Sequence, residues 1–161
     1  MIQDVQPGNV IPIRVLRVDD ELEHLEIARI FMEWEAKDDF EIVNVLSVAK
    51  ALEKLENEYF DVVVSDYNMP GMNGLTFLEV VRQNSKYSDI PFIFFSGTMA
   101  PELVEAALKT GAEKHITKEG DPSTQCNLLT HAIYELARDK YATRQDSRIT
   151  ALEHHAVLHS V

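Results

Sequence analysis

Apolar residues recur along this chain at two different spacings, and each spacing predicts one kind of secondary structure. Five short runs rich in Val, Ile and Phe are typical of strands buried in a parallel sheet. The predicted strands are Ile13–Asp19, Glu41–Leu46, Asp61–Asp66, Pro91–Ser96 and Lys114–Thr117. After each strand, apolar residues recur every three or four positions, which is the pattern of an amphipathic helix.

The large apolar residues of the first predicted helix form one stripe, which we expect to face the core: Ile27, Ile30, Phe31 and Trp34. The later helices carry comparable stripes, at Val48, Ala51, Leu52 and Leu55, at Phe77, Leu78 and Val81, at Val104, Ala107 and Leu108, and at Leu129, Ala132, Ile133 and Leu136. Ser47 and Asp121 are the expected N-caps of the second and fifth helices, and Gly111 is the expected end of the fourth.

The alternation of five strands with five helices predicts an α/β fold. Right-handed crossovers between parallel strands place helices on both faces of the sheet. We therefore predict a single doubly wound (βα)5 domain with a five-stranded parallel sheet. The length of 161 residues also fits about one domain.

The predicted domain occupies residues 13–141. Residues 1–12 contain Pro7, Gly8 and Pro12, and we expect a flexible N-terminal segment there. Residues 142–161 are expected to form a C-terminal tail or a linker helix, because this stretch is too short for an output domain.

Composition excludes several classes of function. The net charge is −12, and an acidic surface repels phosphates, so we do not expect direct binding of nucleic acid. There is no apolar run of membrane-spanning length and no signal peptide, so no membrane association is predicted. The single cysteine, Cys126, excludes an internal disulfide and is typical of a cytosolic protein.

Polar side chains stand where four of the predicted strands end. Asp19 and Asp20 close the first strand, Asp66 closes the third, Ser96 closes the fourth, and Lys118 follows the fifth. In open parallel sheets, ligands bind beyond the carboxyl ends of the strands. We therefore expect these side chains to form one site.

The predicted site has the chemistry of phosphoryl transfer. Three carboxylates at one edge repel one another unless a cation lies between them, and carboxylate oxygens suit Mg²⁺. With the ion bound, one oxygen of Asp66 is free to attack a phosphoryl group. Lys118 would balance charge on the phosphoryl oxygens, and Ser96 would donate a hydrogen bond to another.

Four stretches, "RVDDE", "SDYNMPGMNG", "FFSG" and "HITK", resemble in this order the receiver domain of two-component response regulators. The resemblance implies a strand order of 2-1-3-4-5 and a phosphoacceptor at Asp66. It also implies that Mg²⁺ is bound directly by Asp20, Asp66 and the backbone carbonyl of Asn68, and through water by Asp19.

The same resemblance implies that Ser96, Gly97 and Lys118 bind the phosphoryl group and that His115 occupies the aromatic switch position. Receivers usually have a proline after the lysine, whereas this chain has Glu119, so the turn at residues 120–122 is expected to set the local backbone.

A further departure is Arg17, which lies inside the first predicted strand. We expect its long stem to reach toward an edge of the sheet or its guanidinium to pair with a carboxylate.

The resemblance also implies the partners. The phosphoryl donor would be a sensor histidine kinase or a phosphotransfer protein. A second copy of the chain or a downstream protein would bind through the fourth helix, fifth strand and fifth helix. The domain would catalyse only its own phosphorylation and dephosphorylation, and would otherwise not be an enzyme.

Two alternatives remain open at the level of the sequence. One is a receiver-like interaction module without phosphotransfer, since function depends on the site and not on the fold. The other is a phosphatase of the haloacid dehalogenase type, which would have an Asp-x-Asp pattern on its first strand. This chain has the adjacent pair Asp19-Asp20 there.

Overall fold

The computed structural model describes residues 11–138. Its five strands form one parallel sheet in the order β2-β1-β3-β4-β5, which confirms the predicted topology. The strands are β1 (Ile13–Val18), β2 (Phe40–Val45), β3 (Val62–Ser65), β4 (Phe92–Ser96) and β5 (Lys114–Thr117).

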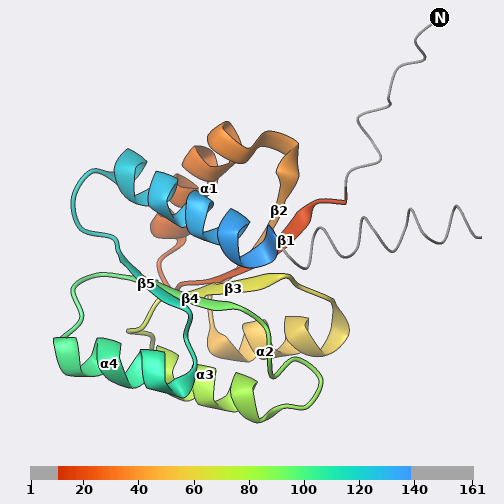
Figure 1. Ribbon diagram of the computed structural model, residues 1–161, viewed down its shortest axis with the longest axis vertical. Helices are drawn as coiled ribbons and strands as arrows, with labels where there is room; N and C mark the ends of the chain where they lie inside the picture. Colours follow the sequence, from red (N-terminus) through yellow and green to blue (C-terminus); the bar gives the residue numbers. More distant parts are fainter. Residues whose placement is uncertain (1–10, 139–161) are drawn as a thin grey trace, which may run out of the picture.

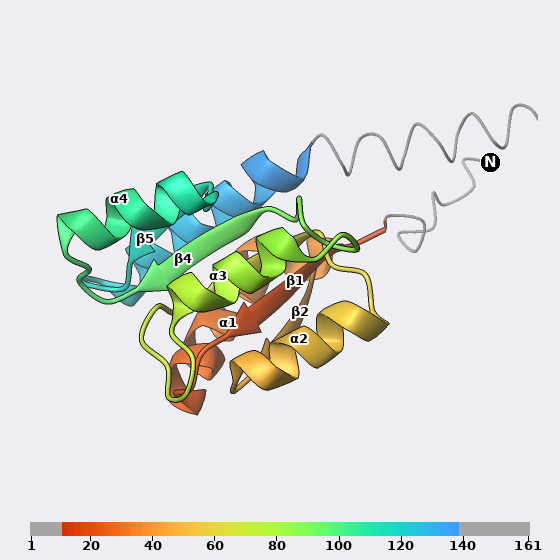
Figure 2. The same ribbon diagram turned by 90° about the horizontal axis from the view of Figure 1, so that it is seen from below.

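Helices cover both faces of this sheet. They are α1 (Leu22–Ala36), α2 (Val48–Asn57), α3 (Gly74–Gln83), α4 (Pro101–Thr110) and a helix over residues 122–138, and a 3-10 turn, η2 (Lys37–Asp39), follows α1. Figures 1 and 2 show α1 and helix 122–138 on one face, and α2, α3 and α4 on the other. The described part of the chain therefore has the three layers expected of a doubly wound domain.

Each face of the sheet has its own buried core. On the face of α2, α3 and α4, aromatic rings from β4 and α3 dominate, and Phe77 meets Phe92 edge-on at 5.4 Å between centroids. On the opposite face, Val15, Val64 and Ile93 of the sheet pack against α1 and helix 122–138. The central strands β3 and β4 are buried throughout, which explains their continuous apolar sequences.

The helix ends follow local chemistry. The Ser47 hydroxyl accepts a hydrogen bond from the backbone N–H of Lys50 at 3.2 Å, which caps α2. Asp121 accepts one from the N–H of Thr124 at 3.3 Å at the start of helix 122–138. Gly111 ends α4 with φ 116°, a conformation that favours glycine. All three predicted helix signals are thus confirmed.

The predicted buried stripe of α1 is wrong for three of its four residues, and the fourth, Phe31, is partly buried against the core. Ile27, Ile30 and Trp34 are 45%, 66% and 84% exposed. The residues that face the sheet are instead Leu25, Ala28, Met32 and Ala36. Two stripes of helical spacing coexist in α1, and the one with the smaller side chains packs on the sheet because it lets the helix approach closely.

Parts of the predicted organisation lie outside the described residues. The flexible segment 1–12 falls mostly on residues 1–10, and the tail 142–161 falls entirely within residues 139–161, neither of which the structure describes. Within residues 11–138, every helix is too short or too polar to cross a membrane.

Candidate functional site

Side chains from four strand ends meet at the carboxyl edge of the sheet. Asp19 follows β1, Asp66 follows β3, Ser96 ends β4, and Lys118 follows β5. The parallel sheet causes this meeting, because strands of one polarity end at the same edge. Each of the four side chains is hydrogen-bonded to at least one other member of the group.

Asp66 is held by contacts to both of its carboxylate oxygens. Oδ1 accepts a hydrogen bond from the Ser96 hydroxyl at 2.7 Å and another from the backbone N–H of Tyr67 at 2.7 Å. Oδ2 accepts one from Lys118 Nζ at 3.0 Å. The side chain remains 12% exposed, so this carboxylate is fixed in place and still accessible.

The pKa of Asp66 lies below its ordinary value. Burial raises it, whereas the hydrogen bond from Ser96 and the charge of Lys118 lower it by more. The carboxyl group is therefore ionised at neutral pH, which is the form that acts as a nucleophile.

The Lys118 ammonium lies among two carboxylates and an imidazole. It is hydrogen-bonded to Asp19 Oδ2 and Asp66 Oδ2, and it lies 3.3 Å from Nδ1 of His24. The backbone N–H of Lys118 donates to the carbonyl of Ser96 at 2.7 Å, which fixes the start of this side chain. One ammonium cannot neutralise two carboxylates.

Asp19 and Asp20 differ in environment although they are adjacent. The Asp19 side chain is completely buried, and its Oδ1 accepts a hydrogen bond from the backbone N–H of Glu21 at 2.9 Å. Asp20 is exposed, as is Asn68 in the loop after β3. The roles of Asp20 and Asn68 as Mg²⁺ ligands stay predictions.

The donor atoms at this edge fit a divalent cation. One ligand atom each from Asp19, His24 and Asp66 lie within 4.8 Å of one another. Mg²⁺ is typically bound by one or two carboxylates and keeps several waters. The two carboxylates, with water on the exposed side, match that requirement.

His24 is a member of this group that the sequence analysis missed. It lies in the first turn of α1, where its Nε2 contacts Glu21 Oε2 at 2.8 Å and its Nδ1 lies 3.6 Å from Asp19 Oδ2. One sequence feature could have indicated His24. It is spaced i, i+3 from Glu21 at the start of a helix, and this helix directly follows the acidic pair Asp19-Asp20.

Arg17 does not reach an edge of the sheet, so the first expectation for it is wrong, and its Nε and Nη1 form no hydrogen bond with a described residue. Its side chain is fully buried, and the guanidinium carbon lies 5.4 Å from the centre of the Phe95 ring. Burial lowers the pKa of Arg17 to about 10, against the opposing effect of the Asp19 charge.

The loop after β3 packs tightly on the start of α3. The N–H of Gly74 donates to the carbonyl of Tyr67 at 2.7 Å. A Cβ at Gly74 would lie 2.6 Å from a ring carbon of Phe94 and 2.7 Å from the carbonyl oxygen of Asp66, so only glycine fits. At Gly97, beside Ser96, a Cβ would meet no atom within 4 Å, and this side of the site is open.

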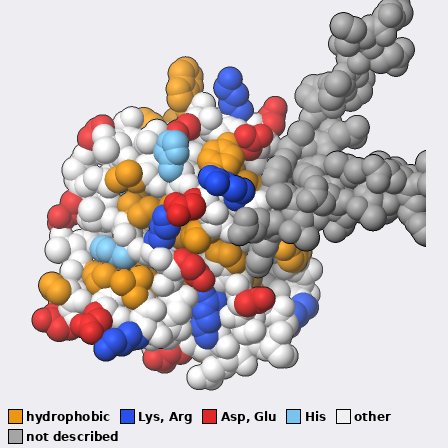
Figure 3. Space-filling model, viewed as in Figure 1, with side chains coloured by type: hydrophobic (Ala, Val, Ile, Leu, Met, Phe, Trp, Pro, Cys, Tyr) orange, Lys and Arg blue, Asp and Glu red, His pale blue; other side chains and the backbone are white. Residues whose placement is uncertain are grey.

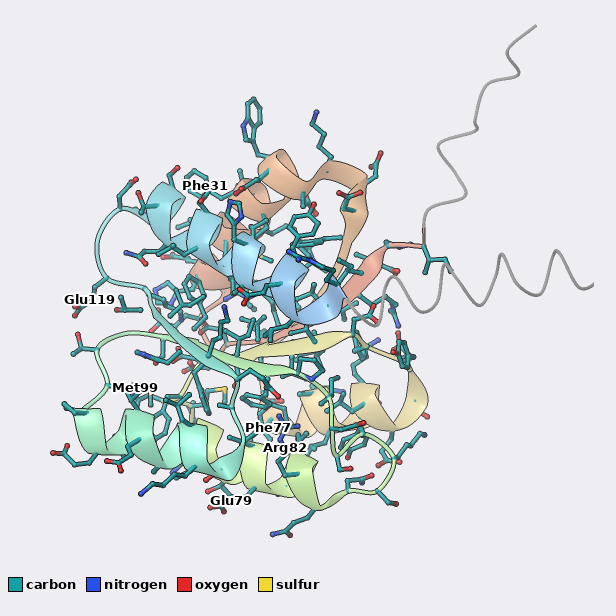
Figure 4. All side chains as sticks on the ribbon, viewed as in Figure 1. Phe31, Phe77, Glu79, Arg82, Met99 and Glu119 are labelled. Atoms are coloured by element: carbon teal, nitrogen blue, oxygen red, sulfur yellow. The ribbon has the colours of Figure 1, made fainter. Side chains whose placement is uncertain are left out.

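Side-chain hydrogen bonds fix the loop after β5, where Glu119 stands at the position at which the resemblance leads us to expect proline. The hydroxyl of Thr117 accepts a hydrogen bond from the N–H of Glu119 at 3.1 Å, and Gln125 Nε2 donates to the Glu119 carbonyl at 2.6 Å. Gly120 has φ 94°, which supplies the turn. The Glu119 side chain, labelled in Figure 4, accepts a hydrogen bond from Thr98 in the loop before α4.

His115 lies on β5 and pairs in register with Phe94 of β4. Its ring is partly buried, and Nε2 has no hydrogen-bond partner among the described residues. Burial lowers the pKa of His115, so the imidazole is neutral at neutral pH in this state.

Comparison with known proteins places this chain in a family. Residues 15–130 match the model of the response regulator receiver domain. A two-component response regulator of Oryza sativa subsp. indica is 31% identical over 131 residues, which cover 80% of this chain and 86% of that protein. A CheY homolog of Campylobacter jejuni subsp. jejuni is 39% identical over 67 residues, which cover 42% of this chain and 52% of that protein.

Solved structures show the same fold. A chemotaxis response regulator of Vibrio cholerae superposes with a TM-score of 0.66 at 27% identity, covering 75% of this chain and 98% of that chain. A CheY-like receiver domain protein of Methanospirillum hungatei gives a TM-score of 0.67 at 24% identity, with coverages of 80% and 99%. The matched stretch contains Asp19, Asp66, Ser96 and Lys118. The chain therefore belongs to the family of response regulator receiver domains of two-component signalling.

Proposed function

We propose that this receiver accepts a phosphoryl group on Asp66 from a phosphohistidine of a sensor histidine kinase or a phosphotransfer protein. The observation that carries the proposal is the environment of the Asp66 carboxylate. One oxygen is held by Ser96 and the Tyr67 N–H and the other by Lys118, while the side chain remains accessible at the sheet edge.

These contacts support an in-line transfer. An ionised oxygen of Asp66 attacks phosphorus, and an O–P bond forms as the P–N bond of the phosphohistidine breaks. The imidazole leaves as the neutral base, because its other ring nitrogen already carries a proton. Lys118 neutralises charge on the phosphoryl oxygens, and the Ser96 hydroxyl turns from Asp66 to one of them. The domain catalyses only its own phosphorylation and the later hydrolysis of the aspartyl phosphate.

Mg²⁺ is the proposed cofactor. Asp20, Asp66 and the backbone carbonyl of Asn68 would hold the ion directly, and Asp19 would hold it through water. The ion supplies positive charge that Lys118 alone cannot provide. The proximity of Asp19 to Asp66 supports a cation at this edge.

The proposed output follows from the placement of Ser96 and Lys118 beside α4 and β5. Movement of the Ser96 hydroxyl would bias two packings of the loop 97–101, with His115 as the switch residue. A second copy of the chain or a downstream protein would bind the face of α4, β5 and helix 122–138. Cys126 is a free thiol, and we expect the domain to act in the cytoplasm, where thiols stay reduced.

The phosphodonor is proposed to dock on α1. Ile27, Ile30 and Trp34 leave a contiguous apolar stripe on this helix at the surface, and such patches mark interaction sites. A cavity of about 260 Å³, lined by residues that include His24, Ile27 and Lys118, connects the stripe to the site. Figure 3 shows that hydrophobic side chains reach the surface in the upper part of the view, where α1 lies in Figure 1.

Incubation of the full chain with acetyl phosphate and Mg²⁺, followed by intact mass spectrometry, tests the assignment. The mass should rise by one phosphoryl group, and Asp66→Asn should abolish the increase. The matched control is Asp89→Asn, because Asp89 is exposed and precedes β4 at the opposite edge of the sheet.

Each other outcome points to a different function. Continued labelling of the Asp66→Asn variant would mean that another residue is the phosphoacceptor. A wild type that binds Mg²⁺ without being labelled would be an interaction module. Steady turnover of a generic phosphomonoester would indicate a phosphatase.

A further inference from the structure

The hydrogen bonds of His24 are those of a typical metal-ligating histidine. Its Nε2 lies 2.8 Å from Glu21 Oε2, and a carboxylate accepts hydrogen bonds but cannot donate them when ionised. Nε2 therefore carries the proton, and the lone pair of the ring is on Nδ1. Ligating histidines typically donate their other N–H to a carboxylate in this way, which fixes the tautomer and the ring orientation.

The contact of His24 with Lys118 points to the same tautomer. Lys118 Nζ lies 3.3 Å from Nδ1, and an ammonium has only donors. Nδ1 is therefore the acceptor. Its lone pair is directed at a positive charge that also contacts Asp19 Oδ2 and Asp66 Oδ2.

The ammonium thus marks a position for a cation with one nitrogen and two oxygen ligands. We propose that Asp19, Asp66 and His24 form a binding site for a divalent transition-metal ion such as Co²⁺, Ni²⁺ or Zn²⁺, and that Lys118 occupies this position until the ion displaces it. This inference rests on the proposed function only in that Asp19 and Asp66 belong to both sites.

The ligand set determines which ions should prefer this position. Carboxylate oxygens alone suit Mg²⁺, whereas imidazole suits the later transition metals. Two positive charges would also compensate Asp19 and Asp66 better than the single charge of Lys118 does. His24 is 42% exposed along its side chain, so an ion can reach Nδ1 from solvent.

Isothermal titration of the full chain with CoCl₂ and with MgCl₂, without any phosphodonor, tests the proposal. All affinities should be compared in a background variant in which His154, His155 and His159 are replaced by Gln. These three residues would otherwise offer imidazoles elsewhere in the chain. In this background, His24→Gln should weaken Co²⁺ binding by roughly tenfold or more, since even partners outside the first shell of ligands typically contribute that much. Its Mg²⁺ affinity should change by less than about twofold, because Mg²⁺ prefers oxygen.

The matched control is His131→Gln. His131 is also exposed on a helix and also contacts a carboxylate, Glu35, at 3.3 Å, yet it lies outside the proposed site. This variant should bind both ions as the background does. Lys118→Met, which removes the competing ammonium, should strengthen Co²⁺ binding.

A second measurement does not depend on substitutions. Paramagnetic Co²⁺ should broaden and shift the NMR signals of the His24 ring at substoichiometric amounts and leave those of His131 unchanged. Equal Co²⁺ affinities for the background and His24→Gln, with an unshifted His24 ring, would overturn the proposal.

Asp66→Asn separates this proposal from the proposed function. The variant should lose Co²⁺ binding if the site is composed as stated. Retained Co²⁺ binding that still depends on His24 would overturn the role of Asp66 in this metal site. Phosphorylation by acetyl phosphate is measured separately, so either proposal can fail alone.

Discussion

Replacing Arg17 with methionine should stabilise the domain. Arg17 is buried on β1, and two of its guanidinium nitrogens have no hydrogen-bond partner among the described residues. A buried charge without hydrogen bonds is costly, and replacing buried ionic groups with apolar side chains of similar volume is often neutral or stabilising. Methionine is unbranched and flexible, so it can fill the same space beside Phe95.

The perturbed pKa gives the magnitude. Burial lowers the pKa of Arg17 to about 10. At roughly 1.4 kcal/mol per pH unit, keeping the group charged in the folded state costs about 3 kcal/mol. The cost is present at neutral pH, because both the folded and the unfolded chain bind the proton there. Arg17→Met should therefore raise the melting temperature by roughly 5–10 °C for a chain of this length.

The assay is thermal unfolding followed by far-ultraviolet circular dichroism in saturating Mg²⁺, which compensates Asp19 after the positive charge is removed. Arg82→Met is the matched control. Arg82, labelled on α3 in Figure 4, donates to the carbonyls of Ser88, Ile90 and Gly111 at 2.9, 2.7 and 2.7 Å. Its loss leaves these acceptors unpaired and should cost about 2 kcal/mol or more.

The same substitution is thus expected to change stability in opposite directions at the buried Arg17 and at the partly buried Arg82. The reasoning about Arg17 is refuted if Arg17→Met melts below the wild type by as much as Arg82→Met does. That result would mean that the Arg17 guanidinium is well compensated in the folded protein.

Four other outcomes are expected. Mg²⁺ should raise the melting temperature in a concentration-dependent way, and Asp20→Ala should weaken this response; identical melting in EDTA and in Mg²⁺ would exclude the site. Burial lowers the pKa of His115 in the folded state. The contribution of this residue to the free energy of unfolding is therefore fully present above pH 6.5 and is lost as the pH falls through the folded pKa. The free energy of unfolding, measured in urea against pH, should therefore fall less in His115→Phe than in the wild type. If phosphorylation and proton uptake are linked, beryllofluoride should raise the pKa of His115 by NMR, and an unchanged pKa would exclude that link. Beryllofluoride should also change amide hydrogen exchange in the loop 97–101, and changes confined to the loop after Asp66 would argue against a transmitted switch.

The meeting of Asp19, Asp66, Ser96 and Lys118 was predictable because it depends on topology alone. Once the strands are identified as parallel, their carboxyl ends share an edge whatever the details of packing. Helix caps were predictable for a related reason. The Ser47 and Asp121 contacts reach only three residues along the chain.

Features that depend on packing in three dimensions were missed. The sequence of α1 carries two apolar stripes, and the choice between them depends on how closely a helix can approach the sheet. Nothing local indicates that Met32 faces inward and Trp34 outward. The contacts of His24 depend on the rotation of α1 that this choice sets, and the position of Arg17 depends on the space beneath Phe95.

Trp34 has a practical consequence for spectroscopy. It is the single tryptophan of the chain, and it is 84% exposed in the folded state. Its indole is in water both before and after unfolding, so intrinsic fluorescence will report denaturation poorly. A partner that covers α1 would instead move the indole into an apolar environment and shift its emission to shorter wavelength. The chain thus carries a native optical probe of docking, and association with a tryptophan-free fragment of a partner can be followed without a label.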